Sequence, residues 1–403
     1  MKRKSLFLGC VILLSRGSVP AHGDSGAIVA WGHNDYGQCC VPEPNRDFTA
    51  VAGGGYHSLG LKADGSITAW GANDYGQGDA PRPNAGYVAI VAGGEHNLAL
   101  KTDGTVVAWG NNALGQCNVP EPNTGFTKIA AGWNHSLGLR IDGSIAAWGD
   151  NPFGQCDVPT PNADFTAIAA GTFHSLGLKT DGSVVAWGIN DYGECNVPEP
   201  NTGFVAITAS AEHSLGLKLD GSIAAWGVND FGECDVPAPN TAFIAIAAGH
   251  WHSLGLKADG SIVSWGYDDD GQCRVPEPNA GFTAVGGGCL HSLALRPLGD
   301  PIAGIVDGSQ HARDIGPTAV PNPSRGQLRI CYELPGATAV TIEIFDASGS
   351  LVRRLPGGWQ TAGNHAADWD GRGDADLRLP SGVYVARIRT TAGAGTGKMV
   401  LTP

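Results

Sequence analysis

Short runs of alternating apolar and polar residues fill most of the chain, and the pattern repeats. Residues 165–188 read FTAIAAGTFHSLGLKTDGSVVAWG. The first seven residues predict a half-buried strand, and HSLGLK alternates with a period of two residues. The Asp181-Gly182 dipeptide predicts a tight turn into a third strand that ends in Trp187 and Gly188. We therefore expect antiparallel strands joined by hairpins.

A turn-rich stretch ends each unit, and the unit recurs with a strict period of 39 residues. Its consensus is N-D-Y-G-Q-C-x-V-P-x-P-N, and its prolines are unsuited to a central strand. The repeated tryptophans are Trp31, Trp70, Trp109, Trp148, Trp187, Trp226 and Trp265, and the repeated histidines are His57, His96, His135, His174, His213, His252 and His291. Three or four short strands in about 40 residues predict the blades of a β-propeller.

The two ends of the array complement each other. The chain enters at residues 26–31 (GAIVAW), a tryptophan strand without a preceding histidine hairpin. It leaves at residues 291–295 (HSLAL), a histidine hairpin without a following tryptophan strand. We expect an all-β fold in which residues 24–297 form a seven-bladed β-propeller closed by the N-terminal strand.

The units A-G-x-x-H-S-L-x-L-K and W-G-x-N-x-x-G-Q resemble the repeats of the regulator of chromosome condensation family, over residues 26–296. They are more similar still to its short-repeat bacterial branch, which includes a secreted β-lactamase inhibitor protein. The resemblance implies a seven-bladed propeller that binds proteins, and the inhibitor binds its target through aromatic loops on one face. The nucleotide-exchange and chromatin roles of the eukaryotic founder transfer poorly to a chain that is acidic and expected to be exported.

The first 23 residues have the features of a signal peptide. Three basic residues (2–4) precede a short apolar run (5–14), and small residues stand near positions 21–23. The run is too short to span a bilayer. We expect a protein without a membrane span that is secreted or held at the cell surface, with a mature chain that begins at Asp24.

Charge and composition limit the classes of partner that the chain can bind. The net charge is −13, and residues 24–297 carry 11 basic against 28 acidic side chains. An acidic surface repels phosphate backbones, so nucleic acid is excluded as a partner. The 61 glycines occur together with 42% hydrophobic residues, which favours an ordered, turn-rich β-protein over a disordered chain.

Comparison of the seven copies separates framework from candidate contacts, because a residue found in every copy serves folding. The repeated histidines are interpreted as half-buried scaffold residues, hydrogen-bonded to backbone or to a neighbouring serine, and the tryptophans as core between blades. The repeated asparagines are interpreted as turn residues that bond their own backbone. They are Asn34, Asn73, Asn112, Asn151, Asn190 and Asn229. No catalytic residue and no cofactor are expected.

Six cysteines recur at the same spacing: Cys39, Cys117, Cys156, Cys195, Cys234 and Cys273. Equivalent atoms of neighbouring blades should lie on the order of 10–13 Å apart, whereas a disulfide needs Cα atoms within roughly 7 Å. We therefore expect small buried thiols rather than disulfides. The sequence indicates no pairing for Cys40, Cys289 and Cys331.

The two residues before each repeated histidine vary within an otherwise uniform frame and are rich in aromatic side chains. The pairs are 55–56 (GY), 94–95 (GE), 133–134 (WN), 172–173 (TF), 211–212 (AE), 250–251 (HW) and 289–290 (CL). Surface drift is one explanation, but aromatic residues dominate binding hot spots. We predict that these pairs ring one propeller face, and that the partner-binding residues are Tyr56, Glu95, Trp133, Asn134, Phe173, Glu212, His250 and Trp251.

A second variable set is mostly aromatic but more uniform, and we expect it to pack in the fold. It consists of Tyr36, Tyr75, Leu114, Phe153, Tyr192, Phe231 and Asp270. The sequence offers two candidate metal sites, and neither is expected to bind a metal ion. Residues 268–270 (DDD) lack further spaced oxygen ligands for Ca²⁺, and the His250/His252 pair lacks a third ligand.

The repeat ends after Arg296, and a different pattern begins at residue 321. Residues 298–320 are expected to be a linker. Residues 321–403 are expected to form a small C-terminal antiparallel β-sandwich, with strands at 327–334, 339–346, 351–355, 365–369, 382–390 and 398–401. Its motifs F-D-A-S-G-S-L-V-R, W-D-G-R and P-S-G-V-Y resemble the immunoglobulin-like domain of flagellar hook-capping proteins and the sorting domain of type IX-secreted bacterial proteins. The resemblance implies a module for export or surface attachment that engages bacterial secretion machinery, and a passive accessory domain is the alternative.

These features favour an exported, non-enzymatic protein that binds a protein partner through one propeller face. A glycan-binding protein and an inhibitor of a secreted enzyme such as a β-lactamase are the alternatives. An extracellular hydrolase is disfavoured, because no nucleophile–base pair or phosphate-binding loop stands out in the sequence.

Overall fold

The computed structural model describes residues 25–297, 317–320, 324, 328–334, 336–347, 349–361, 363–374, 376–390 and 393–402. The expected signal peptide, most of the expected linker and residues 321–323 lie outside this set. The described residues contain 28 strands and no helix, so the all-β prediction is confirmed. It follows that none of them belongs to a helix able to cross a membrane.

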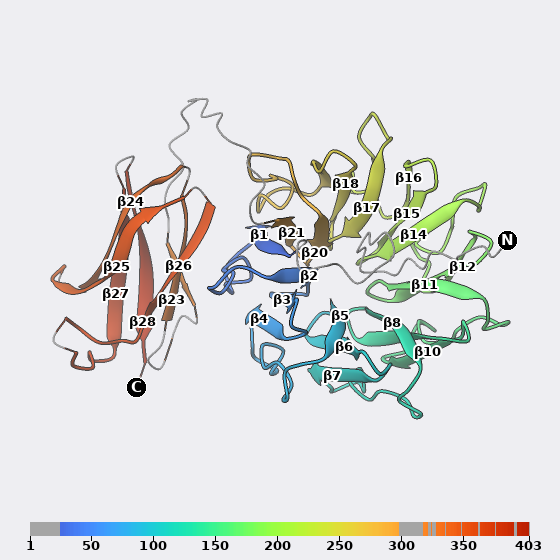
Figure 1. The fold of residues 1–403 in the computed structure, drawn as a ribbon, viewed down its shortest axis with the longest axis horizontal. Coiled ribbons are helices and arrows are strands. Elements are labelled where there is room, and N and C mark those ends of the chain that lie inside the picture. Colours follow the sequence, from blue (N-terminus) through green and yellow to red (C-terminus); the bar gives the residue numbers. More distant parts are fainter. Residues whose placement is uncertain are drawn as a thin grey trace. The chain divides into compact units, whose positions relative to one another are not determined.

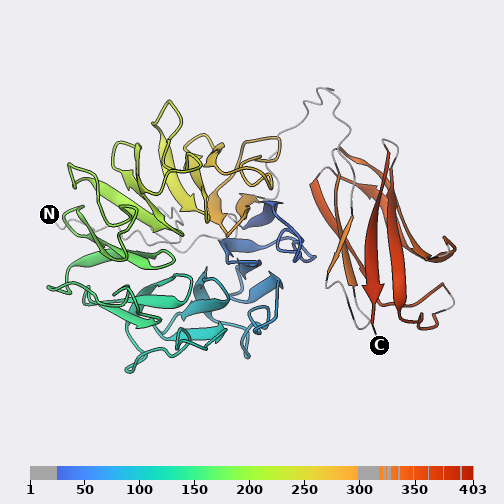
Figure 2. The same cartoon turned by 180° about the vertical axis from the view of Figure 1, so that it is seen from behind.

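The described residues divide into two compact units. The first holds residues 25–33 and 43–297, and the second holds residues 34–42 together with the described residues from 317 onward. In the first unit every copy of the repeat forms three antiparallel strands, and the sheets are arranged around a common centre (Figure 1, and from behind in Figure 2).

Each copy uses its three strands in the same order. The first strands are β2 (Phe48–Gly53), β5 (Tyr87–Ala92), β8 (Phe126–Ala131), β11 (Phe165–Ala170), β14 (Phe204–Ala209), β17 (Phe243–Ala248) and β20 (Ala284–Gly287). The middle strands are β3 (His57–Lys62), β6 (His96–Lys101), β9 (His135–Arg140), β12 (His174–Lys179), β15 (His213–Lys218), β18 (His252–Lys257) and β21 (His291–Pro297). The third strands are β4 (Ile67–Gly71), β7 (Val106–Gly110), β10 (Ile145–Gly149), β13 (Val184–Gly188), β16 (Ile223–Gly227) and β19 (Ile262–Gly266).

The last copy takes its third strand from the start of the chain. Strand β1 (Gly26–Gly32) pairs antiparallel with β21 along its full length, and Trp31 stands opposite Ser292 as Trp70 stands opposite Ser58. One further pairing, Gly26 with Phe48, joins β1 to β2 and gives a six-stranded sheet. The sequence predicted this association from the incomplete hairpins at the two ends.

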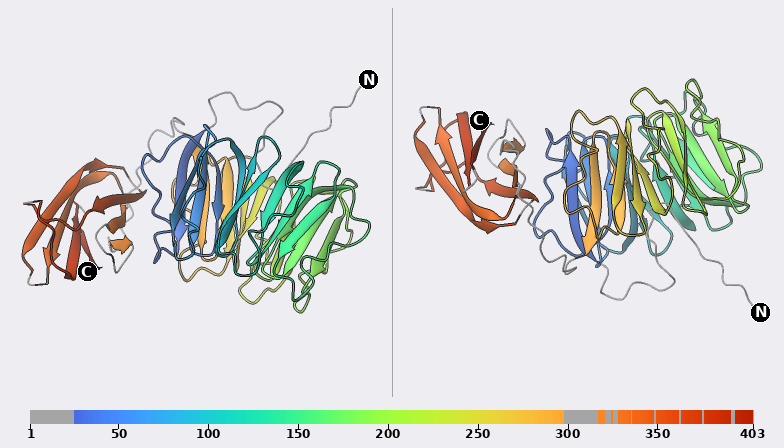
Figure 3. Two further views of the ribbon diagram at one scale, coloured as in Figure 1. Left: turned by 90° about the horizontal axis from the view of Figure 1, so that it is seen from below. Right: turned by 90° about the horizontal axis from the view of Figure 1, so that it is seen from above.

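The two ends of the strands lie on opposite faces of the first unit, because the strands run from one face to the other (Figure 3). At the histidine end, each middle strand begins and the third strand finishes with Trp-Gly, as shown by the pairing of His174 with Gly188. At the turn end, the Asp-Gly turn joins the two strands, and the Gly182 N–H donates to the Lys179 carbonyl.

Each hydrophobic core in the first unit is shared by consecutive copies. Leu176, Leu178 and Val184 of one copy pack against Phe204 and Trp226 of the next. The indole N–H of Trp226 donates to the Glu194 carbonyl at 2.8 Å, which leaves no buried donor unpaired on that ring. The tryptophans are therefore core residues between neighbouring copies, as predicted.

The second unit contains two antiparallel sheets around one core. Strands β22 (Thr318–Val320), β23 (Leu328–Leu334) and β26 (Gly363–Trp369) form one sheet. Strands β25 (Leu351–Gln360), β24 (Thr338–Asp346), β27 (Gly382–Arg389) and β28 (Ala394–Leu401) form the other. Ile330, Ile344 and Trp369 are among its fully buried side chains. The predicted strand positions are confirmed, with three differences. Strand β22 lies wholly inside the segment expected to be a linker, β25 runs five residues longer than expected, and β28 begins four residues earlier.

The unassigned cysteines separate into two environments. Cys40, in the segment 34–42 of the second unit, forms a disulfide with Cys331 of β23, with a Cα–Cα distance of 5.9 Å. Cys289 is a half-buried thiol in the first unit. Of the repeated cysteines, Cys117, Cys156, Cys195, Cys234 and Cys273 keep their thiols as predicted, but they are half-buried rather than buried.

Candidate functional site

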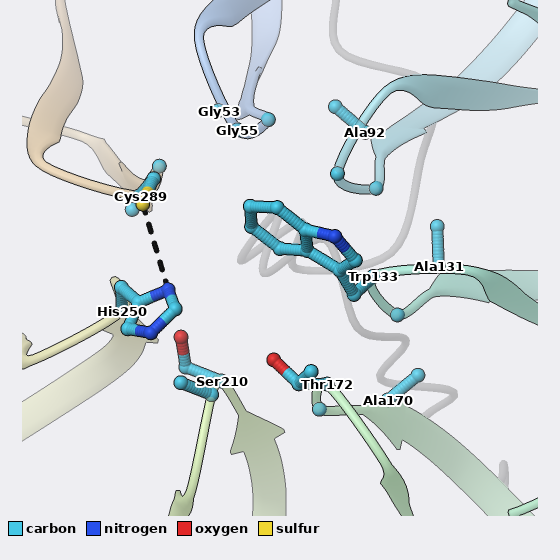
Figure 4. Close-up of a pocket in the computed structure, with 18 of the residues that line it drawn as sticks. Gly53, Gly55, Ala92, Ala131, Trp133, Ala170, Thr172, Ser210, His250 and Cys289 are labelled. Carbon is cyan, nitrogen blue, oxygen red and sulfur yellow. Dashed lines mark hydrogen bonds between the residues drawn. The ribbon is translucent and has the colours of Figure 1, made fainter. Parts of the chain in front are cut away.

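A small pocket lies where the first strands of all seven copies converge at the histidine end. Its volume is about 110 Å³, well below the roughly 300–1,000 Å³ of common small-molecule sites. Most of its lining residues are glycine or alanine. The larger side chains are Trp133, Thr172, Ser210, His250 and Cys289 (Figure 4). The pocket has room for one protruding side chain rather than for a cofactor.

The structure brings the first members of the predicted pairs together around this pocket. They are Gly55, Gly94, Trp133, Thr172, Ala211, His250 and Cys289. The ring of Trp133 extends across the pocket toward His250, and the two ring centroids are 5.9 Å apart in an edge-on arrangement (Figure 4). Four of the seven positions therefore carry larger side chains, and symmetry is broken at the centre of the face.

His250 and Cys289 interact directly, with 3.5 Å between Nδ1 and Sγ. Burial lowers the pKa of the His250 imidazole. Burial, and then the charge of Asp270, raises the pKa of the Cys289 thiol to about 11. At neutral pH the thiol S–H therefore donates to a neutral imidazole. An activated thiolate nucleophile is not formed under these conditions.

The second members of the pairs lie beside the loops that follow each Trp-Gly. Their carbonyls accept a hydrogen bond from the backbone N–H of the residue after that glycine, as in Ile189 to Phe173 and Tyr267 to Trp251, both at 2.9 Å. Tyr56, Glu95, Asn134, Phe173, Glu212 and Trp251 are all partly exposed. Every predicted binding residue therefore lies at the histidine end, either in the pocket or next to it.

The residue after each Trp-Gly is not among the predicted binding residues, although it varies as strongly as the predicted pairs. The seven residues are His33, Ala72, Asn111, Asp150, Ile189, Val228 and Tyr267. Asn111 donates from Nδ2 to the Glu95 carboxylate at 2.8 Å, and the Tyr267 ring contacts the Trp251 ring. The signal was present, because a comparison of the copies at this position shows the same loss of uniformity.

The expectation that the second variable set packs in the fold is wrong for the copies in the first unit. Tyr75, Leu114, Phe153, Tyr192 and Phe231 are between 46% and 60% exposed. The turn puts each side chain on the surface, because the backbone N–H of the same residue bonds a buried Gln or Glu two positions later. This set enlarges the variable surface at the histidine end.

Five rings form a continuous path outward from the pocket, which we name the aromatic arc. Trp133 contacts His250, and His250 contacts Trp251 at a centroid distance of 4.5 Å. Trp251, Tyr267 and Phe231 then contact one another at 5.1–5.6 Å. Edge-to-face contacts of this kind hold aromatic side chains in place without removing them from solvent. Four of these rings come from the fifth and sixth copies, and Trp133 reaches them from the third.

The repeated histidines are framework, and they are fully buried rather than half-buried. Each Nε2 bonds a side chain of the following copy at 2.7–3.0 Å, which is Asn97 for His57 and a serine for the others. In five copies the serine hydroxyl donates to the carbonyl of a buried Gln or Glu, as Ser214 does to Glu194. The imidazole Nε2 must then be the donor to that serine, and the ring is neutral.

The two imidazoles that suggested a metal clip serve different partners. His252 binds Ser292, whereas His250 binds Cys289. In the same region the Asp268 carboxylate accepts from the Cys273 backbone N–H and from Arg274. Among the described residues, no three His, Cys, Asp or Glu side chains are close enough together to share a metal ion.

Three-stranded sheets that repeat around a common axis define the first unit as a β-propeller repeat protein. The regulator of chromosome condensation (RCC1) repeat matches five copies, at residues 48–77, 87–116, 126–155, 165–194 and 243–272. The FlgD Ig-like domain matches residues 325–394. The chain therefore contains RCC1 repeats followed by a FlgD Ig-like domain, as the resemblance in sequence implied.

Solved structures with the same fold come from distant organisms. Prp20p of Saccharomyces cerevisiae is 20% identical with a TM-score of 0.58, over 68% of this chain and 92% of its own. Human WBSCR16 is 16% identical with a TM-score of 0.55, over 67% and 99%. The ectodomain of the Physcomitrella patens receptor kinase CR4 is 23% identical with a TM-score of 0.52, over 64% and 71%. At these identities the likeness shows the fold alone. No curated protein matches the sequence.

Proposed function

We propose that residues 25–297 form a closed seven-bladed propeller that binds a protein partner through its histidine end, without catalysing a reaction. The pairing of β1 with β21 supports closure, and so does the bond from His291 to Ser58. The observation that carries the binding role is the aromatic arc. It breaks the symmetry of a uniform scaffold and leaves aromatic side chains partly exposed, as at binding hot spots.

Relatives with the same fold support a protein partner. The Prp20p structure was reported together with its binding to Gsp1p and histones, and yeast RCC1 (Prp20) has been solved bound to Kap60. The small pocket also favours a macromolecule that inserts a side chain over a free small ligand. Inhibition of a secreted enzyme is one form that this binding can take, and an assay against a panel of secreted hydrolases tests it.

Removal of four pair residues should abolish capture of the partner. The variant combines Tyr56→Ala, Trp133→Ala, Phe173→Ala and Trp251→Ala. Each lost hot-spot aromatic typically costs about 2 kcal/mol or more of binding free energy. A pull-down from the native envelope or medium should therefore lose the bound protein. The matched control changes Ile141 and Leu219 to Ala, because these apolar residues at the turn end are 83% and 82% exposed. Equal capture by both variants would refute the proposal.

A glycan partner is the second candidate. The observation in its favour is that aromatic rings and amide or carboxylate groups share one face, as in Asn111 beside Glu95. Aromatic faces stack on sugar rings, and such groups bind sugar hydroxyls. Binding to a glycan array by the native chain, lost in the four-residue variant, would favour this candidate over a protein.

We further propose that the protein is exported and that the FlgD Ig-like domain delivers it or holds it at the cell surface. The match of residues 325–394 to that family supports an accessory domain. A chain that ends at residue 320 should fold its repeats normally. It should no longer be recovered in the cell-surface fraction. Cell fractionation with an antibody to the repeats measures this. An unchanged distribution would favour the passive accessory domain instead.

A further inference from the structure

Basic side chains are almost absent from the histidine end. Of the eleven basic residues between 24 and 297, seven stand at or near the last position of the middle strands: Lys62, Lys101, Arg140, Lys179, Lys218, Lys257 and Arg296. Each lies over the aromatic ring that begins its own copy, at 3.8–5.7 Å from the centroid. These cations are therefore held at the turn end.

The remaining four basic residues add little positive charge to the histidine end. Arg46 follows Asn45, and Arg82 stands two residues before Asn84. These asparagines bond Ile28 and Ile67, which lie near the turn end of their strands. Lys128 lies within β8. Arg274 alone stands at the histidine end, and its charge is paired with Asp268 at 2.9 Å.

Half of the 28 carboxylates of residues 24–297 stand at the histidine end, in the pair positions and in the loops that follow Trp-Gly. They are Asp74, Asp79, Glu95, Asp150, Asp157, Asp191, Glu194, Glu212, Asp230, Glu233, Asp235, Asp268, Asp269 and Asp270. One paired arginine cannot balance fourteen carboxylates, so the potential over this face is negative. A face of one sign attracts partners of the opposite sign and speeds their association.

Some of these carboxylates adjoin rings of the aromatic arc along the chain, because Asp230 precedes Phe231 and residues 268–270 follow Tyr267. Burial raises the pKa of the Tyr267 phenol, and the nearby charges of Asp269 and Asp270 raise it further. Burial also raises the pKa of Glu212, with smaller contributions from the charges of Glu194 and Asp230. Acidic side chains therefore stand next to Phe231 and within three residues of Tyr267 in the chain.

We propose that the aromatic arc and the carboxylates beside it bind a basic segment of the partner protein. Lysine or arginine side chains lie on the exposed rings and pair with Asp230, Asp269 and Asp270. Cations are attracted to aromatic faces, and the adjacent carboxylates add charge pairing. This inference rests on the proposed function and specifies the partner's chemistry.

Three variants of the full-length protein test this inference. The charge variant carries Asp230→Asn, Asp269→Asn and Asp270→Asn and leaves every ring in place. The arc variant carries Phe231→Ala, Trp251→Ala and Tyr267→Ala. The control variant carries Asp181→Asn, Asp220→Asn and Asp259→Asn, which removes the same charge at the turn end. Each control aspartate accepts a bond from its own turn, and asparagine keeps that acceptor.

Fluorescence anisotropy with labelled hexaarginine, hexalysine and hexaglutamate gives the readout. Hexaarginine should bind the native chain, and hexaglutamate should not. The charge variant and the arc variant should each weaken hexaarginine about tenfold, which corresponds to about 1.4 kcal/mol, whereas the control variant should change it less than about twofold. Equal weakening by the charge and control variants would show a general attraction to an acidic protein and overturn the inference.

Capture of the native partner separates this inference from the proposed function. If hexaarginine displaces the captured partner and the charge variant fails to capture it, the inference is supported. If the charge variant captures the partner normally while the four-residue pair variant does not, the binding face stands and the basic-segment inference fails. If neither variant loses the partner, both proposals fail.

Discussion

The first compact unit, which contains all seven copies of the repeat, should unfold cooperatively when the pH falls from about 6 to 4. Seven fully buried imidazoles have pKa values of about 3 or 4 in the folded chain, because burial disfavours their charged form. In the unfolded chain each titrates near 6.5. The unfolded state therefore binds more protons below pH 6.5, and stability is lost as the pH decreases through this window.

The expected loss is large because seven groups act together. At pH 5 each histidine disfavours the folded state by about 2 kcal/mol, from 1.36 kcal/mol per pKa unit. Seven such contributions are on the order of 10 kcal/mol, comparable with the whole stability of a typical domain. Tryptophan fluorescence and circular dichroism, recorded against pH, should show one steep transition.

A single substitution tests the assignment to histidine. His174→Gln keeps a side-chain donor for Ser214 and removes one titrating group, so proton uptake on unfolding should fall by about one. His365, the one histidine among the described residues of the second unit, is only partly buried. Acid unfolding of the native repeats only below pH 3 would contradict the prediction.

Gly188→Ala should lower the free energy of unfolding of the first compact unit by about 3–5 kcal/mol, at the upper end of the range for single substitutions. Gly188 follows Trp187 and has a φ of +104°, a conformation that other residues rarely adopt. A Cβ there would lie 2.5 Å from the Phe173 carbonyl oxygen and 2.8 Å from the His174 Cα. Both neighbours are backbone atoms, so no side-chain rotation relieves the clash. Urea unfolding gives the measurement.

The chain contains its own control for this substitution. Gly203 also has a positive φ, of +73°, but nothing lies within 4 Å of an added Cβ. In another copy the equivalent position is Ala242, with a φ of +64°. Gly203→Ala should therefore cost about 1 kcal/mol or less. Similar losses for both variants would show that backbone conformation, rather than the close approach at Gly188, determines the cost.

The strands and their pairing could be predicted from sequence, because a pattern that is ambiguous in one copy becomes clear when it recurs in seven. One histidine or one tryptophan is uninformative, but seven in register fix the strands, and the incomplete hairpins at residues 26–31 and 291–295 predict the pairing of β1 with β21. The expected depth of burial was less accurate. The histidines are fully buried because each ring fits beside an invariant or nearly invariant glycine, where an added Cβ at Gly171 would lie 2.3 Å from the His174 Cε1.

The site was only partly predictable. Variation within the repeat located the pairs that line the pocket, but Tyr267 and the exposed Phe231 depend on loop conformation, which residue spacing does not determine. The Cys40–Cys331 disulfide was beyond reach for a related reason. It joins residues 291 positions apart, and only the folded segment 34–42 shows which thiol Cys331 meets.

The histidine-to-serine bonds run in one direction along the chain, and the two bonded residues are 40 positions apart inside the array. Substitution of a serine therefore removes the hydrogen-bond partner of the histidine in the preceding copy, not that of the histidine in its own copy. Asn97 shows that this receiving position tolerates exchange, since it keeps the bond to His57 at 2.7 Å. Genetic suppressors of a defective histidine should accordingly arise in the copy that follows it.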